Sequence, residues 1–142
     1  MTTEIELALM AGGAYISSKN EENQIPAPAN WAKLTSAPDA NSGFEAVTYI
    51  KQGITPISSP EIVISYTSTN GDGDIPADLA LGAGKFSEQL MQAAQYYLDI
   101  KAAAPKDAKI TFAGHSLGGG LAALCFVNQV QVPKDASVQF CV

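Results

Sequence analysis

The chain has 142 residues, 46% of them hydrophobic and 15% charged, which is the composition of a single globular domain with a sizeable core. Its formal net charge is −6 and all eight basic residues are lysines, so neither nucleic acid nor an anionic membrane is an expected partner. No apolar run is long enough for a transmembrane segment. Glu4 and Glu6 stand where a secretory signal peptide would be basic, so we expect a cytoplasmic location or export that is independent of a signal peptide.

No cofactor or metal is expected from the sequence. There is no Cys-x-x-Cys pair and a single histidine, so metal-ligand spacing is absent. Cys125 and Cys141 lie in apolar surroundings, where buried free thiols are favoured over a disulfide. The alternating carboxylates of 70–74 faintly resemble a calcium loop, but the twelve-residue pattern with a terminal glutamate is missing.

The first segment, from Thr3 to about Ser18, is predicted to be a helix. Thr3 and Glu6 have the spacing of a capping box, and apolar residues follow with a helical period. An amphipathic membrane anchor is the alternative, and the lack of lysine or arginine on the polar face disfavours it. The next segment, Lys19–Ser42, is polar and rich in proline, which predicts a surface connection with a short helical turn around Trp31. Trp31 is expected to anchor that connection on the core; the alternative is that it lines a substrate groove.

The rest of the chain alternates between strand and helix patterns. Strands are predicted at Gly43–Lys51, Glu61–Thr67, Lys109–Ala113 and Ser137–Val142, and helices at Pro76–Ala104 and Ser116–Val130. Pro105 ends the first of these helices. Since an apolar central strand, Lys109–Ala113, has a helix on either side of it in the sequence, we expect a parallel sheet that is covered on both faces.

One motif carries chemistry. Gly114-His115-Ser116-Leu117-Gly118 is a G-x-S-x-G sequence between a predicted strand and a predicted helix. A sharp turn there would expose the serine Oγ. Gly114 and Gly118 would flank it because a Cβ at either position would collide with the neighbouring chain. The helix N-terminus would offer free N–H groups to a developing oxyanion. The alternative is a glycine-rich helix start without chemistry.

These residues resemble a known family. The segment GHSLGGGLAAL, 114–124, resembles the nucleophile segment of the class 3 lipases, an α/β-hydrolase group. EIVISYTST, 61–69, is similar to the strand that leads into that family's oxyanion loop, and DIPADL, 74–79, to the segment after it. The similarity covers about 43–126. It implies one three-layer α/β-hydrolase-like domain over 1–142, with a mostly parallel sheet and incomplete at its C-terminal side.

The resemblance also implies roles for particular residues. Ser116 would be the nucleophile, the backbone N–H of Leu117 one oxyanion donor, and Thr69, or else Ser68, the second. The stretch 70–84 would form a lid or groove rim. Thr67 and Ser68 stand where the family usually has Arg-Gly.

The sequence lacks a visible partner for the serine. In the family the acid and histidine of the triad follow the serine, but the single histidine here, His115, is adjacent to Ser116 and cannot readily accept its proton. We expect His115 to be a packed or hydrogen-bonded structural residue. Asp135 precedes the last predicted strand, and the acid would lie beyond Val142.

Two functions follow from this pattern. The first is a serine ester hydrolase of the lipase or esterase type, acting on an acyl ester or lipid by acyl transfer through Ser116, with an incomplete triad. The alternative is a non-catalytic, truncated or diverged chain that acts in binding or self-association, or awaits a missing C-terminal half. A thioesterase or amidase would use the same motif and cannot be separated from an esterase.

Overall fold

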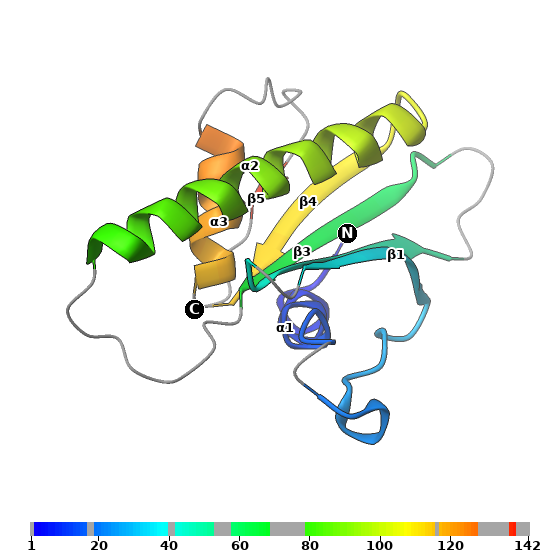
Figure 1. Ribbon diagram of the computed structural model, residues 1–142. Helices are drawn as coiled ribbons and strands as arrows, with labels where there is room; N and C mark the ends of the chain where they lie inside the picture. The colour runs from blue at the N-terminus through cyan, green and yellow to red at the C-terminus, as the bar shows by residue number, and fades with distance from the viewer. Residues whose placement is uncertain are drawn as a thin grey trace.

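The fold is a three-layer α/β arrangement. The computed structural model describes residues 2–16, 19–39, 42–52, 58–68, 79–115, 117–127 and 137–138. In this part of the chain, helices cover both faces of a five-stranded sheet (Figure 1). The elements in chain order are α1 (Glu4–Gly13), the 3-10 helix η1 (Glu21–Asn23), β1 (Trp31–Asp39), β2 (Phe44–Lys51), β3 (Glu61–Ser68), α2 (Leu79–Ala103), β4 (Lys109–Gly114), α3 (Leu117–Val127) and β5 (Ser137–Val138).

The strands follow one another across the sheet in sequence order. β1 pairs with β2, and β2 with β3, in antiparallel fashion, whereas β3, β4 and β5 are parallel. A parallel pair needs a crossover connection, and α2 supplies it between β3 and β4. The α/β prediction is therefore confirmed. The expected parallel pairing holds for β3 to β5, and the antiparallel β1 and β2 make the sheet mixed.

Each face of the sheet has its own core. α1 packs on one face, where Leu7 and Met10 meet Val63 and Ala113. α2 and α3 pack on the other face, around Phe112. Both faces of β4 are thus covered, as the apolar run Lys109–Ala113 predicted.

The first helix begins as its sequence predicts. The Thr3 hydroxyl accepts a hydrogen bond from Glu6 N at 3.2 Å, and Thr3 N donates to the Glu6 carboxylate at 2.7 Å, which is the expected capping box. The helix ends at Gly13 and not near Ser18. A Cβ at Gly13 would lie 2.6 Å from the Tyr49 hydroxyl oxygen, so glycine lets the end of α1 sit close to β2.

The prediction for the segment around Trp31 was wrong. Instead of a helical turn in a loop, Trp31 begins β1, a nine-residue strand that, within the described residues, pairs with β2 alone. Because β1 is an edge strand, Pro38 is tolerated within it. The expected anchoring role is confirmed, since Trp31 is 6% exposed and its Nε1 donates to Glu6 at 3.1 Å.

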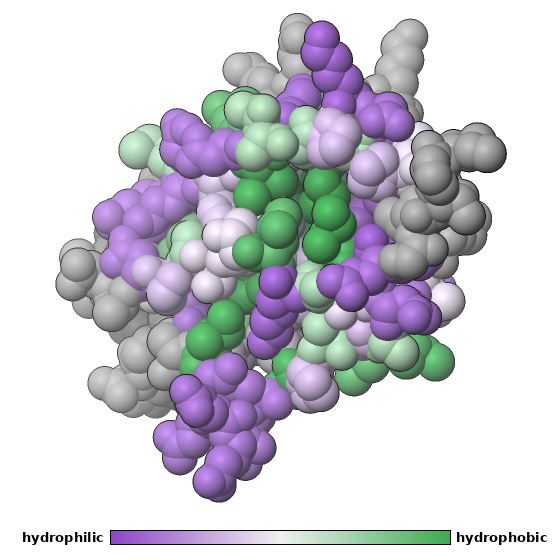
Figure 2. All heavy atoms as spheres, turned by 90° about the vertical axis from the view of Figure 1, so that its right-hand side faces the viewer, coloured by the Kyte–Doolittle hydropathy of each residue, from purple (hydrophilic) through white to green (hydrophobic). Residues whose placement is uncertain are grey.

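The long helix α2 crosses the sheet on the side opposite α1 (Figure 1). It ends at Ala103, two residues before Pro105, as predicted. In the part of the chain that the structure describes, no helix is long and apolar enough to cross a membrane. Figure 2 shows the face at the amino-terminal ends of β3 and β4, where apolar side chains gather between polar ones.

Candidate active site

The candidate site lies where β4 ends and α3 begins. β4 ends at Gly114, α3 begins at Leu117, and only His115 and Ser116 stand between them. β3 runs parallel to β4, and its residue Tyr66 pairs with Gly114. The carboxyl ends of two parallel strands therefore meet here, which is the edge where α/β sheets bind ligands.

The steric reason for the two motif glycines is confirmed. A Cβ at Gly114 would lie 2.6 Å from the Gly119 nitrogen and closer still to the Gly118 carbonyl. A Cβ at Gly118 would lie 2.8 Å from the Thr67 Cα and would collide with the Tyr66 carbonyl oxygen. Since backbone atoms surround both positions, no side chain can turn away to make room. The turn thus packs tightly against the end of β3.

The start of α3 faces this same edge. Gly118 N donates to the His115 carbonyl oxygen at 3.0 Å, which closes the first turn. The N–H groups of a helix's first turn have no carbonyl acceptor within the helix, and they carry the positive end of its dipole. Leu117, the predicted oxyanion donor, is the first residue of α3. Its backbone N–H is therefore one of the donors that α3 leaves without an acceptor inside the helix.

Several predicted site residues lie outside the described part of the chain. These are Ser116, Thr69, residues 70–78 of the expected lid, Asp135 and Cys141. Ser68, the alternative oxyanion donor, is the last residue of β3. Among the described residues, no group of three or more His, Cys, Asp or Glu side chains could hold a metal ion.

Two hydroxyl groups are buried at the same end of β3. Ser65 and Thr67 are both 0% exposed, and neither Ser65 Oγ nor Thr67 Oγ1 has a hydrogen-bond partner in the described structure. They share one face of β3 with Val63, which belongs to the α1 side. A small neutral side chain thus occupies position 67, where the lipases that the sequence resembles usually have arginine.

The single histidine contacts a tyrosine that the sequence did not reveal as a site residue. His115 is exposed, and its Nδ1 lies 3.2 Å from the Tyr15 hydroxyl oxygen. The two rings are edge to face, with centroids 6.2 Å apart. The hydrogen-bonded role expected for His115 is confirmed, although the ring is exposed and not packed in the core. The two residues are 100 positions apart, so no local pattern could have linked them.

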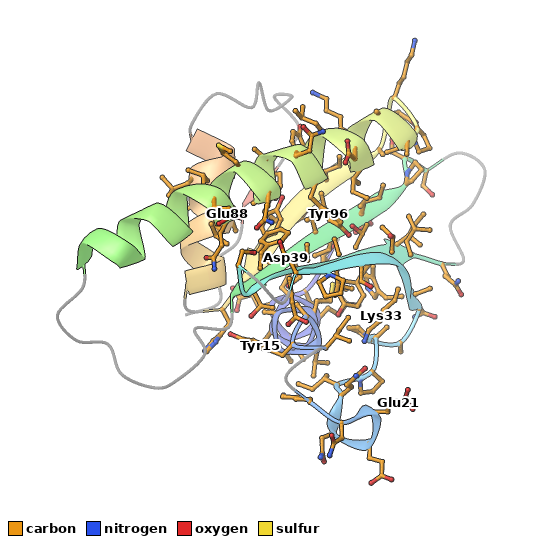
Figure 3. The ribbon with its side chains drawn as sticks, viewed as in Figure 1. Tyr15, Glu21, Lys33, Asp39, Glu88 and Tyr96 are labelled. Atoms are coloured by element: carbon orange, nitrogen blue, oxygen red, sulfur yellow. The ribbon has the colours of Figure 1, made fainter. Side chains whose placement is uncertain are left out.

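Tyr15 follows the end of α1, and its backbone N–H donates to the Gly12 carbonyl oxygen at 3.4 Å. Figure 3 shows it beside that helix, toward the carboxyl-terminal end of β3 and β4. The buried Tyr49 hydroxyl donates to the Met10 carbonyl oxygen at 3.4 Å and ties α1 to β2. Burial raises the pKa of Tyr49, so this hydroxyl stays protonated and remains a donor.

Comparison with known structures supports the same fold. The chain is similar to lipase II from Rhizopus niveus, with a TM-score of 0.60 and 19% identity over 96% of this chain and 59% of that one. It is also similar to a mutant form of MDLA from Penicillium cyclopium, with a TM-score of 0.57 and 12% identity over 97% of this chain and 62% of that one. The chain thus spans about three fifths of the length of these structures.

Comparison of sequences identifies the family. No curated protein matches the chain. A family model described as phospholipase-like, the Tle-like phospholipase domain, matches residues 6–132, which is most of the sequence. The chain therefore belongs to the Tle-like phospholipase domain family, and it shares the α/β fold of the two structures above.

Proposed function

We propose that this chain supplies the nucleophile portion of a phospholipid carboxylic ester hydrolase, as part of a single α/β-hydrolase-like domain that spans 1–142. The observation that carries the proposal is the packing of Gly118 against the backbone of Tyr66 and Thr67. This contact brings the N-terminal turn of α3 to the end of β3, where the resemblance to lipases puts an oxyanion loop. The printed family description, phospholipase-like, supports a phospholipid as the substrate.

The proposed reaction is acyl transfer through Ser116. Its Oγ forms a bond to the ester carbonyl carbon, and the carbonyl electrons move onto the oxygen. The N–H of Leu117 and a donor from Thr69, or else Ser68, stabilise that oxyanion. The ester C–O bond then breaks, and the leaving alcohol takes the proton that Ser116 gave up. Water repeats the sequence on the acyl-enzyme and releases the fatty acid.

The proposed reaction needs a base that these residues do not supply. His115 is the only histidine in the sequence, and its Nδ1 faces Tyr15. Because His115 is the direct neighbour of Ser116 on a tight turn, its side chain is also poorly directed toward Ser116. The proposed proton acceptor is therefore a histidine outside the 142 residues. Removal of the base from a serine triad lowers the turnover number roughly 10⁶-fold. The rate that remains is about 10³–10⁴ times that of the uncatalysed reaction in water.

The test is release of heptanoic acid from diheptanoylphosphatidylcholine by the protein and by Ser116→Ala. Release that disappears in Ser116→Ala supports the proposal, and release that is equal in both proteins contradicts it. If neither protein releases acid even with added imidazole as a substitute base, while both remain folded, a binding or association role replaces the catalytic one. The single histidine and its engagement with Tyr15 are the observations that favour this second role.

A further inference from the structure

We propose that the edge strand β1 is a strap that opens on its own, while the rest of the sheet stays folded, and that side-chain hydrogen bonds to α1 and α2 hold it closed. β1 lies at one edge of the described sheet, and β2 is the only element of the described chain with which it makes extensive contact (Figure 1). The inference goes beyond the proposed function and does not rest on it.

The first step concerns burial. Trp31 is the one buried residue of β1, and its Nε1 donates to the Glu6 carboxylate of α1 at 3.1 Å. The other residues of the strand are exposed or half-buried, and Leu34 is 57% exposed. In β2, by contrast, residues 44–49 are all buried. Because burial of apolar surface supplies most of the stability of a fold, the core holds β2 far more firmly than β1.

The second step concerns the pairing of β1 with β2. The register shifts between Lys33 and Thr35, so the ladder leaves Leu34 out. Such an irregularity disrupts the hydrogen bonds of the ladder locally. Among the described residues β1 has no second neighbouring strand, whereas β2 also pairs with β3. Breaking one interrupted ladder therefore frees β1, and β2 keeps its other ladder.

The third step concerns two hydrogen bonds from α2. The Tyr96 hydroxyl donates to the Thr35 carbonyl oxygen at 3.3 Å, in the middle of β1. Gln92 Nε2 donates to the Asp39 carboxylate at 2.6 Å, at the last residue of the strand. Figure 3 shows Tyr96 on α2 and Asp39 on β1 beneath it. Together with the bond at the first residue of β1, these bonds fasten the strand at its start, middle and end, and each contributes only modestly to stability.

Opening of the strap would change one edge of the sheet. β2 would stay in place, because it is buried and paired with β3. The backbone N–H and C=O groups of β2 that β1 covers would become accessible. An uncovered strand edge pairs readily with another extended strand. The three fastening bonds therefore control whether the edge of β2 is accessible.

The test is amide hydrogen exchange, followed by nuclear magnetic resonance at increasing urea concentration. We expect the β1 amides that donate to β2 to exchange faster than the amides of β3 and β4. Their exchange rate should depend only weakly on urea, because local opening exposes less surface than global unfolding does. Exchange of β1, β3 and β4 at one rate with one urea dependence would overturn the proposal, since β1 would then open only when the whole domain unfolds.

Tyr96→Phe tests the bond at the middle of β1. It keeps the ring and removes the donor to Thr35, so exchange in β1 should accelerate about fivefold while exchange in β3 and β4 is unchanged. The Tyr96 hydroxyl oxygen also lies 2.8 Å from Thr48 Oγ1 of β2. Thr48→Val is therefore the control, because it removes this second contact and keeps the bond to β1.

Gln92→Leu tests the bond at the end of β1. It removes the bond to Asp39 and also the one that Gln92 accepts from the Ser42 hydroxyl, and it should accelerate exchange in β1 in the same way. Gln95→Leu is the matched control, because Gln95 is exposed on the same helix and donates to Asp99 within it. If neither Tyr96→Phe nor Gln92→Leu accelerates exchange in β1, or if both accelerate exchange equally in β1, β3 and β4, these bonds do not hold a separate strap and the proposal is wrong.

Discussion

The backbone of Tyr66 passes over Gly118 at the point that a Cβ of residue 118 would occupy. The Tyr66 carbonyl oxygen and the Thr67 Cα are the nearest atoms to that position. Neither belongs to a flexible side chain, so the contact fixes how closely the start of α3 approaches the end of β3. The proposed catalytic turn depends on this approach, because it brings the α3 N-terminus to the carboxyl end of the parallel strands.

Two alanine substitutions in α3 should separate the steric effect of this contact on stability from the higher intrinsic helix propensity of alanine. Gly118→Ala should lower the free energy of unfolding by about 1–3 kcal/mol or more, because the new methyl group overlaps backbone. Gly120→Ala, on the same helix, meets nothing within 4 Å and should be neutral or stabilise by about 0.5–1 kcal/mol. Urea denaturation followed by circular dichroism measures both variants. Equal effects would show that the Gly118 contact is not formed.

The capping box of α1 should make stability depend on pH. Hydrogen bonds from the Thr3 backbone and hydroxyl, and then from Trp31, hold the pKa of Glu6 below its ordinary value of 4.5. A carboxylate with a lowered pKa in the folded state contributes stability above the pKa of the unfolded chain. That contribution should be lost as the pH falls from about 4.5 through the folded pKa.

Glu6→Gln should remove this part of the acid sensitivity, as measured by thermal unfolding between pH 3 and pH 6. Glu4→Gln is the control, because Glu4 is exposed in the same helical turn. An acid profile that Glu6→Gln leaves unchanged would argue against the cap. Thr3→Ala should cost about 1 kcal/mol, since it removes the acceptor for Glu6 N.

The hydroxyl of Tyr66 should contribute to the core beneath the site. It donates to the Ala93 carbonyl oxygen of α2 at 2.8 Å, while the ring stacks on Phe112 with centroids 6.1 Å apart. Tyr66→Phe keeps the ring and removes the hydrogen bond, and should cost about 0.5–1.5 kcal/mol. Chemical denaturation measures the loss. A variant as stable as the wild type would mean that α2 is not tied to β3 at this point.

Much of this fold is readable from local sequence. The capping box of α1, the strand patterns of β2 and β3, and the proline after α2 are each set by residues a few positions apart. The packing of the motif glycines can also be predicted from local sequence, because it follows from a strand, a tight turn and a helix in direct succession.

What the sequence did not reveal depends on contacts between distant residues. β1 has a mostly exposed edge-strand pattern with Pro38 inside it, and it exists because β2 offers a pairing partner. Tyr15 reaches His115 only because α1 folds back on β3 and β4. Neither feature leaves a periodic signal in its own segment.

The central proposal is that Ser116 is the nucleophile and that it needs a base which these residues do not supply. The direct test is labelling of the purified chain with a fluorophosphonate probe, with and without added imidazole as a substitute base, against Ser116→Ala. We expect labelling that imidazole accelerates and that Ser116→Ala abolishes. A folded protein with no Ser116-dependent labelling, even with imidazole, would contradict the account and leave the chain as a hydrolase-like fold without hydrolase chemistry.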